Sequence, residues 1–216
     1  MNIVRICGLA ALMVVLVVVV CSAAVGIFER DADVGDTPKT GAIEFNADTG
    51  AYRVTGGGAN IWAKVDAFHF AWRQISGDVV VTADVKFFGT GAVDHRKAVL
   101  MIRQNLDRNA AYADVALHGD GLTSLQFRPS AGAETEEQRS TLNMPARIRI
   151  ARWGNQFTMY AAKEGEELAP TGPVTVVLQD PVYVGIGVCS HDANTLETAM
   201  FSNVRIETAS TVYFFK

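Results

Sequence analysis

The stretch that most constrains the fold is residues 96–128, RKAVLMIRQNLDRNAAYADVALHGDGLTSLQFR. Apolar residues alternate with other residues in three short runs within it, and a period of two is typical of β-strands that bury one face. Gly119, Asp120 and Gly121 separate the second run from the third, and these residue types favour tight turns. The pattern predicts three consecutive strands.

The same pattern recurs along the chain at intervals of roughly ten residues. Further strands are predicted at residues 41–45, 51–55, 66–72, 79–87, 147–152, 157–161, 174–178, 182–189 and 198–207. Beyond the N-terminal apolar segment, no run has the period of a helix. Many short strands separated by turn signals favour a single all-β domain, built as a two-sheet antiparallel β-sandwich or jelly roll.

The N-terminal segment carries one positive charge, Arg5, and then an apolar run that ends in small residues. This is typical of an export signal, so we predict a signal peptide at residues 1–24, cleaved before Val25. The apolar run is also about 20 residues long, which is enough to span a bilayer, and an uncleaved anchor helix is the alternative. A lipid-acceptor role for Cys21 is disfavoured because the β-branched Val20 precedes it.

On each of these alternatives the domain lies outside the cytoplasm: periplasmic, secreted or membrane-anchored. Residues 25–40 are polar and are predicted to form a flexible tether, and residues 41–208 the β-sandwich domain. Contact with a membrane is expected only through an uncleaved N-terminal segment. The oligomeric state is left open.

Charge and cysteine content exclude some functions. The net charge is −4 and the basic residues are scattered, which argues against nucleic-acid binding. Of three cysteines, Cys7 and Cys21 lie in the predicted signal, so a cleaved form has no intrachain disulfide. Cys189, in an apolar run, is predicted to be a small buried hydrophobic residue.

If the apolar side chains of the three strands in 96–128 face one core, the opposite face collects a group of polar side chains. Planar hydrogen-bond donors, histidine and aromatic side chains are the residue types that bind ligand hydroxyl groups. The indole of Trp62 or Trp72 can stack on a sugar ring when it is exposed. The predicted ligand-binding residues are Arg103, Tyr112, Asp114, His118, Gln126, Arg128 and Trp72.

Four stretches carry a resemblance to a known family: GDVVVTADVKF, RKAVLMIRQ, AYADVALHGDGLTSLQFR and YVGIGVCSHDANTLETAMFSNVRIE. They resemble concanavalin A-like (laminin G-like) jelly rolls of the DUF1349 type, especially those attached to bacterial TolB-like propeller proteins. The resemblance covers residues 41–207. It implies a curved sandwich whose concave sheet binds or cleaves saccharides. Calcium is common in that superfamily and is implied as a possible ligand of loops such as residues 191–195.

No cofactor is predicted, and the four histidines have no spacing that suggests a zinc site. The Glu-x-Asp-x-x-Glu pattern of the retaining glucanases of this fold is absent, and a retaining mechanism needs two carboxyl groups about 5 Å apart. Asp114 is the one carboxylate clearly placed on the polar face. Asp114 and His118 are therefore weak catalytic candidates.

Three functions follow. The first is an exported, non-catalytic carbohydrate-binding or cell-envelope recognition domain that uses the polar concave face. The second is a glycan-active hydrolase or lyase, with Asp114 or His118 as general base. The third is a structural or protein-interaction module whose polar face is an internally satisfied network. Donors that point into an open groove would favour the first, and donors consumed internally the third.

Overall fold

The computed structural model describes residues 24–208, which form β-strands and no helix. No part of this range therefore forms a helix that could cross a membrane. The strands are β1 Arg30–Val34, β2 Ala42–Asn46, β3 Ala51–Gly56, β4 Ile61–Trp62, β5 Val65–Asp66, β6 Phe68–Ile75, β7 Val79–Phe87, β8 Lys97–Arg103, β9 Tyr112–His118, β10 Thr123–Arg128, β11 Glu136–Arg139, β12 Arg147–Trp153, β13 Gln156–Ala162, β14 Ala169–Pro170, β15 Val174–Thr175, β16 Val182–Cys189 and β17 Glu197–Thr208.

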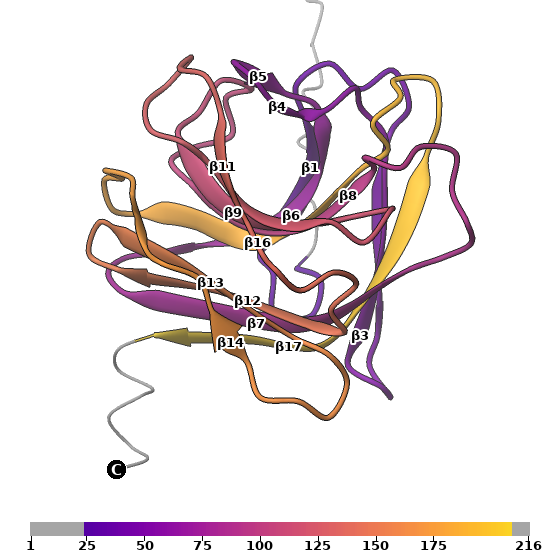
Figure 1. The fold of residues 1–216 in the computed structure, drawn as a ribbon. Helices are drawn as coiled ribbons and strands as arrows, with labels where there is room; N and C mark the ends of the chain where they lie inside the picture. The colour runs from indigo at the N-terminus through magenta and orange to yellow at the C-terminus, as the bar shows by residue number, and fades with distance from the viewer. Residues whose placement is uncertain (1–23, 209–216) are drawn as a thin grey trace, which may run out of the picture.

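Two antiparallel sheets face each other (Figure 1). The first has seven strands in the order β1-β6-β16-β8-β9-β10-β11. The second has eight, in the order β14-β13-β12-β7-β17-β3-β2, with β15 also paired to β13. The predicted two-sheet antiparallel sandwich is confirmed. The predicted signal peptide or anchor helix lies outside the described residues.

The main core lies between the two sheets and contains the apolar sets that the alternation predicted. On β8, β9 and β7 these include Leu100, Val115 and Val81, all fully buried. Fully buried branched and aromatic side chains each contribute roughly 1.5–3 kcal/mol, so this core accounts for much of the stability of the sandwich. Cys189 is also fully buried, as predicted.

A second, smaller apolar cluster covers part of the outer face of the first sheet. Phe68 and Phe70 of β6, Val99 of β8 and Ile61 of β4 belong to it. The sheet curves around the short β4–β5 hairpin, which lies over the inside of the curve (Figure 1). The outer face of the first sheet is therefore concave and partly roofed, which decides which of its polar side chains can reach a ligand.

Residues 25–40 are not a flexible tether, contrary to the prediction. β1 forms the edge of the first sheet and pairs with β6 from Arg30↔Trp72 to Val34↔Phe68. Phe28 is 1% exposed and packs edge-on against Tyr52 in the main core. The tether was predicted because the segment is polar. A strand at the edge of a sheet can be polar, since only the side chains that face the core need to be apolar.

A buried histidine fastens β1 to the sheet. His69, which is 2% exposed, places Nδ1 2.8 Å from Asp33 Oδ1 and Nε2 3.3 Å from Asp31 Oδ2. Hydrogen bonds that involve a charged group contribute about 1.5–3 kcal/mol.

We expect His69→Ala to lower the free energy of unfolding by about 1–3 kcal/mol and to release β1 locally, because both aspartates lose their shared partner. Hydrogen exchange of the β1 amides measures this release. His95→Ala, which changes an exposed histidine, is the control. Unchanged protection of β1 in His69→Ala would show that backbone pairing alone holds the strand.

Candidate functional site

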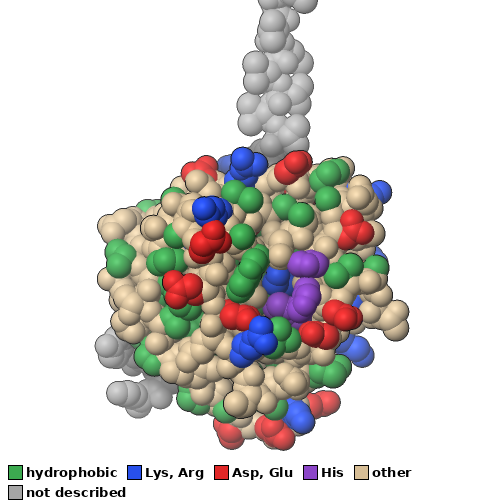
Figure 2. Space-filling view, turned by 45° about the horizontal axis from the view of Figure 1, so that its top comes forward, with side chains coloured by type: hydrophobic (Ala, Val, Ile, Leu, Met, Phe, Trp, Pro, Cys, Tyr) green, Lys and Arg blue, Asp and Glu red, His purple; other side chains and the backbone are tan. Residues whose placement is uncertain are grey.

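One pocket opens on the concave face of the first sheet, with a volume of about 190 Å³. We call it the concave-face pocket. Figure 2 looks onto this side of the molecule and shows histidine side chains gathered beside a hollow. The pocket is lined by Asn60, Trp62, His95, Lys97, His118, Leu122, Gln126, Glu137, Arg139 and His191.

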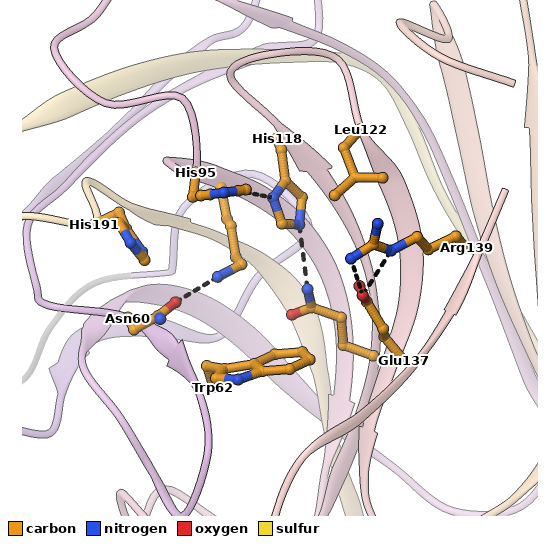
Figure 3. A pocket seen from close by; sticks show the side chains of 10 residues that line it. Asn60, Trp62, His95, His118, Leu122, Glu137, Arg139 and His191 are labelled. Atoms are coloured by element: carbon orange, nitrogen blue, oxygen red, sulfur yellow. Dashed lines mark hydrogen bonds and ion pairs between the residues drawn. The ribbon is translucent and has the colours of Figure 1, made fainter.

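Strand register explains how the floor of the pocket is built. Lys97 of β8 pairs with His118 of β9, so their side chains lie next to each other on the same face. Gln126 of β10 pairs with Glu137 of β11, which continues this face across four neighbouring strands. The rim comes from loops: His95 precedes β8, and His191 follows β16. Trp62 and His118 lie on opposite sides of the pocket (Figure 3).

Trp62 is held in place by an internal ion-pair cluster of Asp66, Arg103 and Arg128. Arg128 donates to both carboxylate oxygens of Asp66, at 2.7 and 2.9 Å. It also donates to the carbonyl oxygens of Trp62, Ala63 and Ala110, so all of its guanidinium nitrogens are engaged. Arg103 reaches Asp66 at 3.4 Å. The cluster thus ties the β4–β5 hairpin, and with it the indole, to β8 and β10.

Five of the predicted ligand-binding residues lie on the face where the alternation placed them and divide into two groups. His118 and Gln126 line the concave-face pocket. Arg103, Tyr112 and Arg128 have no exposed surface beneath the hairpin, and the Tyr112 hydroxyl lies 3.2 Å from Thr135 Oγ1. The donors of Arg128 are consumed internally. We therefore assign these three residues to support of the hairpin and not to ligand contact.

Trp72 is not the stacking platform. It is 6% exposed, and its ring stacks on Phe70 with centroids 5.8 Å apart. Trp62, the other tryptophan that the sequence suggested, is partly exposed in the pocket wall. A two-residue strand in a hairpin was too short to be placed from its pattern, whereas the tertiary packing of β6 covered Trp72.

A hydrogen-bond chain fixes the protonation of the histidines. Gln126 Nε2 lies 3.2 Å from His118 Nε2, and an amide nitrogen only donates, so His118 Nε2 accepts. His118 then carries its proton on Nδ1, which lies 3.3 Å from His95 Nδ1. Burial, together with the nearby charge of Lys97, lowers the pKa of His118 to about 3. His118 is therefore uncharged at neutral pH, and His95, whose Nδ1 accepts from His118, has its Nε2–H left to donate at the rim.

Lys97 forms the deepest cation of the pocket. Its side chain is 2% exposed, and its ammonium donates to Asn60 Oδ1. Burial lowers the pKa of Lys97, and no carboxylate among residues 24–208 forms an ion pair with it. A buried ammonium without an ion-pair partner is costly to the fold, which makes this residue informative about a ligand.

Asp114 lies on the same face but does not line the pocket. Both of its carboxylate oxygens are buried and have no hydrogen-bond partner. Burial raises the pKa of Asp114 well above the ordinary value, because an ionised carboxylate is poorly solvated there. A carboxyl group that lies outside the pocket has no route to act as general base on a ligand within it.

The pocket itself offers one carboxylate, Glu137, whose Oε1 lies 2.6 Å from Arg139 Nη2. Two carboxyl groups facing one ligand, as glycoside hydrolysis requires, are not present in the pocket. Within residues 24–208, no group of three His, Cys, Asp or Glu is arranged to hold a metal ion. The Cys189 thiol is no nucleophile candidate, because burial raises its pKa to about 11.

Several pocket residues escaped prediction. The sequence predicts His95 and Lys97 in one loop and His191 in another, with no spacing that joins them. The structure brings the rings of His95, His118 and His191 together, with centroids 5.5 and 5.7 Å apart for the two neighbouring pairs. Asn60 and the β11 residues Glu137 and Arg139 come from two further segments, so only the folded chain reveals the set.

Comparison with solved structures gives matches at low sequence identity. A functionally unknown protein from Saccharomyces cerevisiae matches with a TM-score of 0.62 at 13% identity, over 81% of this chain and 94% of that one. A glycosyl hydrolase family protein from Mycobacterium fortuitum matches with a TM-score of 0.50 at 13% identity, over 87% and 96%. The carbohydrate-binding module CBM66 from Bacillus subtilis matches with a TM-score of 0.49 at 14% identity, over 87% and 98%.

The fold is a two-sheet antiparallel jelly roll. At such low identities the likeness establishes the fold and leaves the function of this jelly roll to be argued from its own site. No family model matches the chain, and no curated protein matches it. The resemblance to the DUF1349 type therefore stays a prediction.

Proposed function

We propose that this jelly roll is an exported, non-catalytic carbohydrate-binding or cell-envelope recognition domain that takes one sugar unit in the concave-face pocket. One observation carries the proposal: the partly exposed ring of Trp62 lies across the pocket from His118 (Figure 3), and the pocket lining includes polar side chains that have unused hydrogen-bonding atoms. Among these, Gln126 Oε1 and His191 Nδ1 are buried and have no partner. A sugar presents an apolar C–H face to an indole and hydroxyl groups to such atoms.

The size and the lining of the pocket agree with this role. Its volume of about 190 Å³ is below the several hundred Å³ of pockets that enclose drug-sized ligands. It suits a single ring, such as the end or a branch of a polymer. Proteins of the same fold include a glycosyl hydrolase family protein, which adds support at the level of the fold.

Binding without hydrolysis is favoured over the hydrolase or lyase alternative. Glu137 is paired with Arg139, Asp114 lies outside the pocket, and His118 is engaged at both nitrogens. No second carboxylate faces the place where a glycosidic bond would lie. The structural alternative fits only the roofed half of the face, where all the donors of Arg128 are used within the internal ion-pair cluster.

Cell location and family follow as further parts of the proposal. The charge and apolar pattern of residues 1–24 supports export, with the domain periplasmic, secreted or anchored outside the cytoplasm. The four stretches quoted above support a DUF1349-type domain of the kind attached to TolB-like propellers. Calcium in the 191–195 loop stays a prediction, which a chelator titration of thermal stability can test.

We expect Trp62→Ala to weaken glycan binding at least tenfold, because stacking of an aromatic ring is a main source of contact area in a small open site. A glycan array, followed by titration calorimetry of the full chain, measures the loss. The matched control is Trp153→Ala, which removes an exposed tryptophan from β12 of the opposite sheet. Equal binding by both variants would exclude the concave-face pocket as the site.

A further inference from the structure

The concave-face pocket carries an excess of positive charge. Its one carboxylate, Glu137, is neutralised by Arg139 through contacts at 2.6 and 2.7 Å. Lys97 stands apart from this pair, bound to the neutral side chain of Asn60. The floor of the pocket thus holds a buried ammonium with no carboxylate at ion-pair distance among residues 24–208.

No neighbouring carboxylate contacts Lys97 directly, although Asp114, Asp66 and Glu137 attract its ammonium from a distance. Asp114 faces the same side of the sheet, but its oxygens have no partner and so do not contact Lys97. Asp66 is engaged by Arg128 and Arg103. His95, His118 and His191 add N–H donors and no acidic group. A buried cation without a carboxylate in direct contact is costly to the fold, and an anion from a ligand would reduce this cost.

We infer that the sugar unit in this pocket is a hexuronate whose carboxylate lies beside the Lys97 ammonium and the Asn60 side chain, with Trp62 against the ring. The inference rests on the proposed function and names its ligand class. A carboxylate carries a single charge, which matches the single unpaired cation, whereas a phosphate group carries about 1.5–2 charges. Charge-assisted hydrogen bonds of this type are about twice as strong as neutral ones.

Pairs of glycans that differ only in charge test this inference. The full chain is titrated with oligogalacturonate, oligoglucuronate and oligomannuronate, with the methyl ester of each, and with a sulfated neutral oligosaccharide. We expect one of the acids to bind at least tenfold more tightly than its methyl ester. The preference should shrink at high salt, because added ions screen the attraction between unlike charges.

Asn60→Asp places a carboxylate against Lys97 with almost no change in shape. We expect this variant to lose the preference for the acid over its ester, because the ammonium is then satisfied internally. Asn155→Asp, in the exposed β12–β13 turn, is the matched control and should behave like the parent protein. Thermal unfolding of both variants confirms that each is folded.

The outcomes separate the two proposals. If the acid and its ester bind with equal affinity and Trp62→Ala binds neither, the hexuronate assignment is overturned and the carbohydrate site remains. Binding of the sulfated sugar but of no uronate would also overturn it. An acid preference that survives in Asn60→Asp would move the carboxylate away from Lys97 and refute the assignment. Absence of binding to every glycan, charged or neutral, would overturn the proposed function as well.

Discussion

Replacing Asp66 with alanine is expected to lower the free energy of unfolding by about 3–5 kcal/mol, because two arginines are then left buried without a counter-charge. Asp66 is 1% exposed, and Arg103 and Arg128 are wholly buried. The same change removes the link between the β4–β5 hairpin and the sheet, so Trp62 should lose its fixed position. We therefore expect glycan binding to be lost together with stability.

Urea denaturation measures the change in stability, and tryptophan fluorescence in the absence of denaturant reports on Trp62. Glu44→Ala is the control, since Glu44 forms an exposed ion pair with Arg53 at 3.5 Å. Exposed pairs of this kind contribute about 0–1 kcal/mol. If both variants were destabilised equally, the internal ion-pair cluster would not be what secures the hairpin.

Asp114→Asn is expected to stabilise the protein, and to do so increasingly as the pH rises. The ordinary pKa of an aspartate is 3.8, and burial raises that of Asp114 well above it. Between these two values the folded parent protein holds a proton that the unfolded chain has released. Its stability therefore falls with increasing pH by roughly 1 kcal/mol per pH unit over this window. The asparagine variant lacks this loss because its side chain does not titrate.

The measurement is the difference in unfolding free energy between variant and parent at several pH values from 4 to 8. His118 acts in the opposite direction: its folded pKa of about 3 lies below the ordinary 6.5, so stability is lost as the pH falls through this range. Both proteins contain His118, and its contribution cancels in the difference. If the difference in unfolding free energy between Asp114→Asn and the parent does not vary with pH, Asp114 is ionised and solvated in the folded protein.

The sandwich was predictable because its central strands obey a strict period of two. In β8 and β9, Leu100 and Val115 face the main core while Lys97 and His118 face outward. The edge of the sheet was not predictable in this way. β1 is short, contains two aspartates, and is ordered by His69 from a distant strand, so its sequence alone resembles a loop.

The site was predictable only in part, and the roof over the sheet is the reason. Alternation placed Arg103, Arg128, His118 and Gln126 on one face, which the register confirms. It carried no information on the β4–β5 hairpin, which covers the arginines and leaves the other two open to the pocket. Alternation along a strand determines which face a side chain occupies. Whether that position is covered depends on the hairpin, which is distant in sequence: Asp66 and Arg128 are 62 residues apart.

The ordered start of the domain also determines how far it can stand from a surface. Sixteen extended residues at 25–40 would have allowed a reach of about 50 Å from a membrane. Instead, Phe28 is already in the main core and β1 begins at Arg30. If the predicted anchor is retained, the jelly roll has almost no free chain between bilayer and body. It would then bind only polymers that lie close to the membrane.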